Sequence, residues 1–372
     1  MEDIDIFPGV LMLGEIKRSS ALIGVIIGIE KVSPKRDCLL TAQTQTIFDM
    51  FHQIRRVRGV HESANEIDSD KALTAHDFLG EFIGKVTTRN WHSVDVGKRV
   101  AVIGAGPAGL FAARQLAEDG AHVVIFNRDI KPGGLAEYGI YPEKYKMKEG
   151  SRKQFRQIMQ MPEIDYYGNV TISQEGDLTL EELKNAGFQA LVVAAGAQGT
   201  KWLGLPGEDI PKGVYHAKDI VYHYNKLPPF SQKDFYIGNH VALVGAGNVM
   251  LDIARWLIRT VKVEEVIAVV RRGPAEVKFD KKEMEYVIAN LDREALDQEV
   301  ERVAPVMQAI EQDPEAAKTF ILAALPKALE PISKTRFRFD FLASPVRIIG
   351  NADGQVCGIE IEENKLVLAN GD

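Results

Sequence analysis

Two strand–turn–helix–strand segments, each with glycines in its turn, constrain this chain more than any other feature. The first covers residues 99–126, with Gly104 opening its turn, and the second covers residues 241–270, with Gly245 in the same place. An apolar strand, a glycine turn, a helix and a second apolar strand are typical of the βαβ unit of parallel sheets. We therefore predict an α/β protein with two Rossmann-like dinucleotide-binding domains.

The first glycine turn has the complete G-x-G-x-x-G pattern directly after a strand. Its first glycine permits a tight turn, its second lets the backbone approach a pyrophosphate, and its third lets helix and strand pack closely. The N-terminus of the helix that follows favours negatively charged phosphates. In this context the pattern is specific, and it predicts a dinucleotide site formed by Gly104, Gly106, Pro107, Ala108 and Gly109.

Three further segments lie where this fold would bring the chain close to the nucleotide. Asn127 ends the second strand, where an acidic residue usually binds the ribose, and its amide can bond a hydroxyl without charge assistance. Gly133, Gly134 and Leu135 offer backbone suited to lie against a flavin or its phosphates. Gly196 follows an apolar strand that ends in small residues, where the chain could pass close to a cofactor. Each of these segments, taken alone, is also compatible with a plain loop or strand end.

The second glycine turn differs from the first at its third position. Gly245 and Gly247 are present, but Met250 stands where a small residue is usual. Either the helix lies farther from its strand, or the methionine side chain points elsewhere. Arg271 and Arg272 follow the next strand, where an acid would favour NAD and a guanidinium matches the 2′-phosphate of NADP. The second unit is therefore predicted to bind NADP.

Composition excludes several classes of protein. The 372 residues include 45 basic and 52 acidic side chains, a net charge of −7, which does not suit nucleic-acid binding. Two cysteines, Cys38 and Cys357, cannot form a disulfide framework or ligate an iron–sulfur cluster. The longest apolar run, residues 21–29, is too short for a membrane-spanning helix and indicates a buried strand. The N-terminus is acidic, unlike a signal peptide, and we expect a cytoplasmic protein.

Several short segments, in order along the chain, make it similar to a known family. They are residues 133–140 (GGLAEYGI), 205–209 (LPGED), 247–255 (GNVMLDIAR), 271–274 (RRGP), 279–283 (FDKKE) and 341–345 (FLASP). With the two glycine turns they resemble the adrenodoxin reductase (ferredoxin–NADP reductase) branch of the two-domain flavoprotein reductases. The glutamate synthase small subunit is a near relative of that branch. The resemblance covers most of the chain, from residue 98 to its end.

The resemblance implies that the first unit binds FAD and the second binds NADPH. It also implies electron transfer from NADPH through flavin to a ferredoxin-like iron–sulfur protein or a flavodoxin-type carrier. Asn248 and Val249 would contribute backbone to the NADP pyrophosphate. Arg271 and Arg272 would hold the 2′-phosphate, and Glu283 would lie near the nicotinamide ribose. No nucleophile or general base is needed, because the cofactors carry the chemistry.

Domain boundaries follow from these assignments. Residues 1–98 are predicted to form an N-terminal extension, residues 99–197 with 343–372 the FAD-binding domain, and residues 198–342 the NADPH-binding domain. The family that this chain resembles continues beyond the position of residue 372. Its next strand and the glycine-containing start of its next helix complete the flavin site. Two alternatives therefore stay open. They are an electron-input subunit of a larger complex, like the glutamate synthase small subunit, and a redox-inactive nucleotide-binding module.

Lysines and arginines concentrate between Lys144 and Arg156. Such a segment could dock an acidic ferredoxin or flavodoxin and steer its approach, although an exposed basic helix without a partner explains it equally well. Residues 280–318 are acidic and helical in pattern, which predicts a helical insertion within the NADP-binding unit. His216 and His223 do not have the spacing of metal ligands, so no metal site is predicted.

Overall fold

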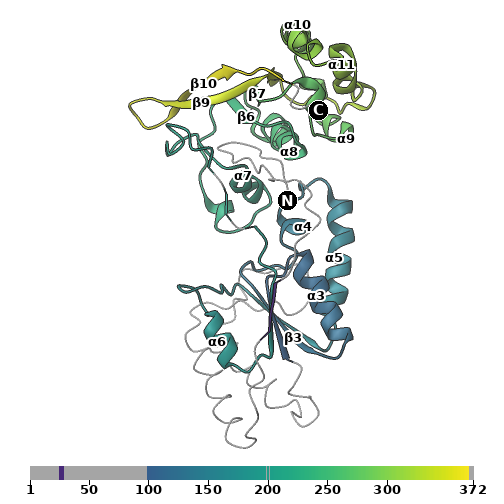
Figure 1. The fold of residues 1–372 in the computed structure, drawn as a ribbon, viewed down its shortest axis with the longest axis vertical. Helices are drawn as coiled ribbons and strands as arrows, with labels where there is room; N and C mark the ends of the chain where they lie inside the picture. The colour runs from purple at the N-terminus through teal and green to yellow at the C-terminus, as the bar shows by residue number, and fades with distance from the viewer. Residues whose placement is uncertain (1–24, 29–98, 198, 201, 368–372) are drawn as a thin grey trace, which may run out of the picture. The chain divides into compact units, whose positions relative to one another are not determined.

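The computed structural model describes residues 25–28, 99–197, 199–200 and 202–367. These residues divide into two compact units, and the boundary between them along the chain lies between residues 197 and 199. We call residues 25–28 and 99–197 the first unit, and residues 199–367 the second unit (Figure 1). The predicted N-terminal extension, with Cys38, lies outside the described residues except for 25–28.

A five-stranded sheet forms the centre of the first unit. Its strands are β1 (Val25–Gly28), β2 (Arg99–Ile103), β3 (His122–Asn127), β4 (Ile164–Gly168) and β5 (Ala190–Val193). The strand order is β1-β5-β2-β3-β4, and all pairs are parallel except β1 with β5. The apolar run at residues 21–29 therefore contains a strand, as predicted. The first βαβ unit, β2 to β3, is confirmed.

Helices cover both faces of this sheet. They are α3 (Pro107–Glu118), α4 (Leu135–Tyr138), α5 (Tyr145–Met159) and α6 (Leu180–Asn185). Figure 1 shows α3 and α5 on one face and α6 on the other. Because both faces are covered, β2 and β3 are almost continuously apolar, as expected for central parallel strands.

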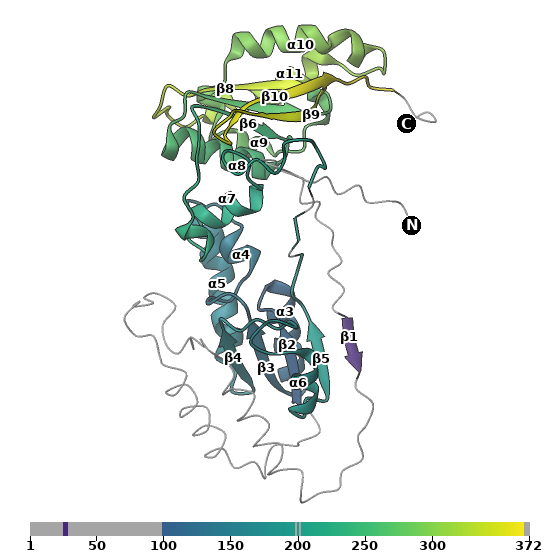
Figure 2. The same ribbon diagram turned by 90° about the vertical axis from the view of Figure 1, so that its left-hand side faces the viewer.

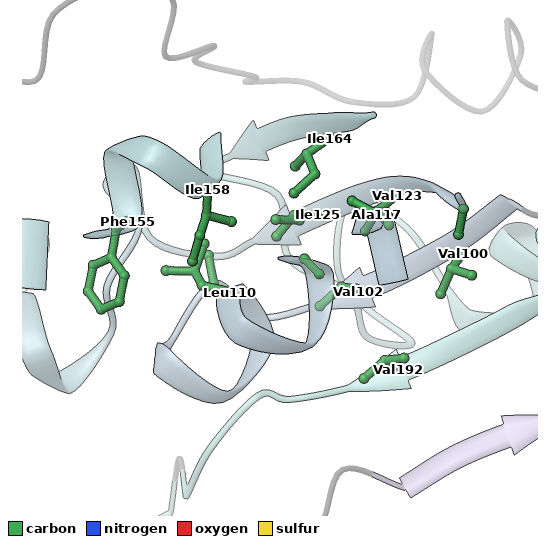
Figure 3. Close-up of a cluster of buried hydrophobic side chains, with 13 residues drawn as sticks. Val100, Val102, Leu110, Ala117, Val123, Ile125, Phe155, Ile158, Ile164 and Val192 are labelled. Carbon is green, nitrogen blue, oxygen red and sulfur yellow. The ribbon is translucent and has the colours of Figure 1, made fainter. Parts of the chain in front are cut away.

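The core under α3 shows why this helix can lie so close to the sheet. Leu110, Ala113 and Ala117 are buried and recur at helical spacing, so they form one face of α3. Figure 3 shows Leu110 and Ala117 in one cluster with valines and isoleucines of the strands. Phe155 and Ile158 of α5 close the cluster. Small alanines on the helix leave the backbone of α3 near β2, which the glycine turn requires.

The second unit has a three-stranded parallel sheet in the order β6-β7-β8. The strands are β6 (His240–Val244), β7 (Glu265–Val270) and β8 (Arg336–Phe341). Helix α7 (Ala217–Tyr224) precedes the sheet. Helix α8 (Asn248–Trp256), which continues into a π-helical turn, Leu257–Val261, joins β6 to β7. The second βαβ unit is thereby confirmed.

The predicted helical insertion between β7 and β8 is confirmed. It contains α9 (Lys281–Met284), α10 (Arg293–Gln308) and α11 (Pro314–Leu322), and Figure 2 shows α10 and α11 together at one end of the second unit. α10 is fastened to the end of β8. The Phe341 N–H donates to Glu299 (2.6 Å), and Arg302 donates to the Phe341 carbonyl (2.6 Å).

The C-terminal strands depart from the predicted domain boundaries, which assign residues 343–372 to the FAD-binding domain. β9 (Ala343–Gly350) and β10 (Val356–Glu363) form an antiparallel hairpin, but residues 336–341 form β8, a parallel sheet strand. Alternation of apolar and polar residues predicts a strand, not its direction of pairing. The hairpin groups with the second unit, not with residues 99–197, because Ile348 packs among Leu205, Ile210 and Val214.

Within the described ranges, no helix combines the length and apolar character needed to cross a membrane.

Glu265, at the start of β7, supports the second sheet electrostatically. Its buried carboxylate accepts hydrogen bonds from Arg336 and Arg338 (3.1 Å) and lies 3.3 Å from His240 Nδ1. Burial alone would raise the pKa of Glu265, but the hydrogen bonds outweigh burial and lower the pKa. The ion pairs therefore stabilise the fold above the ordinary glutamate pKa of about 4.3, and this stabilisation is lost as the pH falls through the lower folded value.

We predict that Glu265→Gln lowers the free energy of unfolding by about 1–3 kcal/mol at pH 7, because it removes charge-assisted hydrogen bonds. The difference from the wild type should shrink toward zero as the pH falls below about 4. Urea unfolding across this pH range measures both effects. The exposed neighbour Glu264, replaced by Gln, is the matched control. An equal loss at every pH would contradict the electrostatic explanation.

Candidate functional site

The first glycine turn is built from backbone contacts that leave no room for side chains. Gly104 has φ +103°, and a Cβ there would lie 2.5 Å from the Ala194 carbonyl oxygen. A Cβ on Gly109 would lie 1.9 Å from the Gly104 carbonyl oxygen. Both distances are impossible for real atoms, so these two positions require glycine. The turn thus sits between α3 and the end of β5, just before Gly196.

The middle glycine of the turn, Gly106, borders open space. It is the N-cap of α3, Pro107 begins the helix, and a Cβ on Gly106 would meet no atom within 4 Å. A 12-residue helix whose N-terminus faces open space provides backbone N–H groups and a partial positive charge for an anion. Ala108 lies in the first turn of the same helix. The geometry fits a pyrophosphate, as the sequence predicts.

Gly133 and Gly134 lie directly against this turn. The Gly133 N–H donates to the Ala105 carbonyl (2.7 Å), and a Cβ on Gly134 would come within 3.1 Å of Gly106 Cα. Both glycines have positive φ, and Leu135 begins α4 with half of its side chain exposed. The structure therefore brings together the two glycine segments that the sequence predicts for one cofactor.

Asn127 has partners within the protein. Its Oδ1 accepts from the Ala105 N–H (2.9 Å), and its Nδ2 donates to the Asp129 carbonyl (2.8 Å) and the Tyr166 hydroxyl (3.2 Å). Burial is the largest cause that raises the pKa of Tyr166, so its hydroxyl stays protonated. Asn127 therefore holds the glycine turn in place, a role that the motif does not reveal. Ribose binding by Asn127 stays a prediction.

Glu137, which is buried, forms an ion pair with Arg152 beside the first glycine turn. Arg152 donates to both of its carboxylate oxygens, with Nε–Oε2 and Nη2–Oε1 distances of 2.8 and 2.7 Å. Burial alone would raise the pKa of Glu137, but the hydrogen bonds from Arg152 outweigh it and lower the pKa. Lys148 is buried nearby, and burial lowers the pKa of its ammonium. Arg152 joins α5 to Glu137 of α4 while its own side chain stays partly exposed, and Lys148 is buried.

The basic segment Lys144–Arg156 thus divides into an inner and an outer part. Arg152 and Lys148 are used within the unit, and Arg156 forms an ion pair with Glu149. Lys146 and Lys153 are exposed on α5. The outward positive charge is smaller than residue counting alone indicates.

The second glycine turn repeats the geometry of the first. Gly245 has φ +127°, its N–H donates to the Val269 carbonyl (2.9 Å), and Gly247 is the N-cap of α8. Asn248 begins this helix, and its side chain pairs with Asp280, accepting from the backbone N–H (2.7 Å) and donating to the carboxylate (2.8 Å). The turn is thereby tied to α9. Asp280 lies in the segment FDKKE, but no local pattern in the sequence marks it as a partner of Asn248.

The remaining predicted residues of the second site lie on the elements expected of them. Val249 is half-buried in the first turn of α8, and Met250 is fully buried, so its side chain fills interior space. Arg271 and Arg272 are exposed directly after β7. Glu283 is half-buried on α9. Among the described residues, no group of three or more histidine, cysteine or acidic side chains could hold a metal ion.

Comparisons with known proteins agree with this geometry. A family model described as pyridine nucleotide-disulphide oxidoreductase matches residues 98–322. The chain is 30% identical to the probable NADPH:adrenodoxin oxidoreductase of Dictyostelium discoideum, over 72% of this chain and 59% of that protein. It is also 30% identical to the NADPH-ferredoxin reductase FprA of Mycobacterium leprae, over 72% of this chain and 64% of the relative.

Among solved structures, a point mutant of FprA from Mycobacterium tuberculosis superposes with a TM-score of 0.58 and 28% identity. The match covers 73% of this chain and 65% of that one. The chain therefore spans about three fifths of the length of the curated relatives it matches.

We predict that Asn127→Asp destabilises the first unit by about 1–3 kcal/mol at pH 7, because a carboxylate cannot donate to the Asp129 carbonyl that it would face. The substitution restores the residue usual in the motif, so the motif alone predicts tighter nucleotide binding. Thermal unfolding and FAD titration decide between the two expectations. Asn185→Asp, at an exposed position, is the control. Unchanged stability with tighter binding would assign Asn127 to the ribose.

Proposed function

We propose that this chain, which belongs to the pyridine nucleotide-disulphide oxidoreductase family, is an FAD-dependent NADPH oxidoreductase. It would pass electrons from NADPH through flavin to a ferredoxin-like iron–sulfur protein. The observation that carries this proposal is the pair of glycine turns in separate units, one of them followed by exposed arginines. Relatives named NADPH:adrenodoxin oxidoreductase and NADPH-ferredoxin reductase support the same assignment.

The first unit would hold FAD. Gly104, Gly106 and Gly109 shape the turn, and the N-terminus of α3 would face the pyrophosphate. Gly133 and Gly134 would lie against the same cofactor, because they pack on the turn. A side chain in place of one of these closely packed glycines would push the backbone of the turn out of position for the cofactor.

The second unit would hold NADPH. Gly245 and Gly247 place the N-terminus of α8 toward the pyrophosphate. Arg271 and Arg272 would bind the 2′-phosphate, since an exposed guanidinium can form paired hydrogen bonds to phosphate oxygens. When bound, the two cofactors supply hydride and single-electron chemistry, while the protein binds and orients them.

The electron acceptor would be a small acidic carrier. Lys146 and Lys153 are exposed on α5. The apolar residues Tyr145 and Met147 of the same helix are each more than half exposed. Exposed lysines steer an acidic partner, and apolar side chains support its contact. This surface of α5 is therefore our candidate docking site for ferredoxin or flavodoxin.

We also propose a cytoplasmic location, on the basis of sparse cysteines in a chain of ordinary globular composition. Several relatives are named as mitochondrial, so cell fractionation is the direct test.

The absorption spectrum of the purified chain, supplied with FAD, tests the function. We expect flavin bands that bleach under anaerobic NADPH much faster than under NADH, because the arginines favour a 2′-phosphate. Bands retained without bleaching would contradict the reductase activity. If FAD is not retained but NADPH still binds, the chain is a nucleotide-binding module. Electron transfer seen only with a co-purifying large subunit would indicate an input subunit.

We predict that Arg272→Ala raises the KM or Kd for NADPH by about tenfold to a hundredfold, the usual range for a lost charge-assisted hydrogen bond. The values for NADH should stay within about twofold, because NADH lacks the 2′-phosphate. Arg347→Ala is the matched control, since Arg347 is also exposed but pairs with Glu360 in the hairpin (2.8 Å). Equal losses for both coenzymes would place Arg272 outside the phosphate site.

A further inference from the structure

The turn that carries Arg271 and Arg272 is held by residues far away in the chain. The Arg272 carbonyl accepts from the Leu342 N–H (3.2 Å), and the Leu342 carbonyl accepts from the Asn364 N–H (2.7 Å). The Asn364 side chain then donates to the Arg271 carbonyl (2.8 Å). Three hydrogen bonds thus link the backbone of the two arginines to Leu342 and Asn364. Asn364 makes two of these three bonds.

Asn364 itself is fixed from several sides. Its Nδ2 also lies 2.8 Å from the Ser344 hydroxyl oxygen, at the start of β9. The preceding residue, Glu363, accepts a hydrogen bond from Arg302 of α10 (2.8 Å). Beyond it, Leu366 lies over the arginine turn, because a Cβ on Gly273 would be 3.3 Å from its Cδ1. Asn364 therefore connects the arginine turn to the hairpin and to α10.

Orientation matters at this turn because both arginine side chains are long and exposed. Each loses rotamer entropy when it binds phosphate, and the loss is smaller if its backbone already points toward the ligand. A carbonyl held at 2.8 Å restricts the backbone direction at Arg271. The hydrogen bond acts on the peptide group of Arg271 and not on its guanidinium.

We propose that Asn364 is a positioning residue that holds the Arg271–Arg272 turn and so determines the preference for nucleotides with a 2′-phosphate. This inference rests on the proposed NADPH function and adds to it a residue that is distant in sequence and does not itself touch the nucleotide. The ligand class is an adenosine nucleotide with phosphate on the 2′-oxygen.

Isothermal titration calorimetry with two probes, adenosine 2′,5′-bisphosphate and adenosine 5′-monophosphate, tests the proposal, since the probes differ only in the 2′-phosphate. We expect Asn364→Ala to weaken binding of the bisphosphate about threefold to tenfold, the range for one hydrogen bond, and to leave the monophosphate unchanged. Asn364→Gln keeps the amide donor and should recover part of the preference. Asn351→Ala, in the far turn of the same hairpin, should change neither affinity.

A double-variant cycle separates positioning from general support. In an Arg271→Ala/Arg272→Ala background both carbonyls remain, so any structural role of Asn364 persists while the phosphate-binding side chains are gone. Adding Asn364→Ala there should leave the ratio of the two affinities unchanged. A further change in that ratio would overturn the proposal.

The outcomes are distinct. An unchanged affinity ratio in Asn364→Ala, or equal weakening of both probes, overturns the positioning role while the proposed function stands. A wild-type chain that binds both probes equally contradicts NADP binding itself, and the positioning role fails with it. If the alanine variant no longer binds the monophosphate because it misfolds, Asn364→Ser takes its place in the same comparison.

Discussion

Close approach of backbone to backbone at the first glycine turn is the constraint on which the first unit depends. A side-chain carbon on Gly109 would lie 1.9 Å from the Gly104 carbonyl, and one on Gly104 would meet Ala194 at 2.5 Å. Helix α3 can therefore rest against β2 and β5 only without side chains at these points. The alanines of α3 extend the same close packing along the sheet.

The second unit solves the same problem differently. Met250 occupies the position of Gly109 and is fully buried, so interior volume is filled by a flexible side chain rather than by direct backbone contact. Its glycine turn is instead tied to α9 through Asn248 and Asp280. An asparagine thus holds the glycine turn in each unit, Asn127 in the first and Asn248 in the second.

Local patterns along the chain predict most of the fold and only part of the site. Strand β2 and the two glycine turns follow from apolar runs and glycine spacing, which are local properties. Alternation at residues 336–341 predicts a strand but not that it pairs in parallel with β7, because pairing depends on distant residues. The same limit explains Arg152 and Lys148. Their positive charge is visible in the sequence, but the ion pair of Arg152 with Glu137 and the burial of Lys148 are not. Asn364 gives no local signal at all, since its partner Arg271 is 93 residues away.

Asn127 has a consequence for how the first turn responds to its surroundings. A carboxylate at this position would gain and lose a proton, and its hold on the Ala105 N–H would change with acidity. An amide has no such equilibrium in the range where proteins are folded. It also donates to the Asp129 carbonyl, which a carboxylate cannot do. The hydrogen bonds of Asn127 therefore hold the turn in the same way at low and at neutral pH.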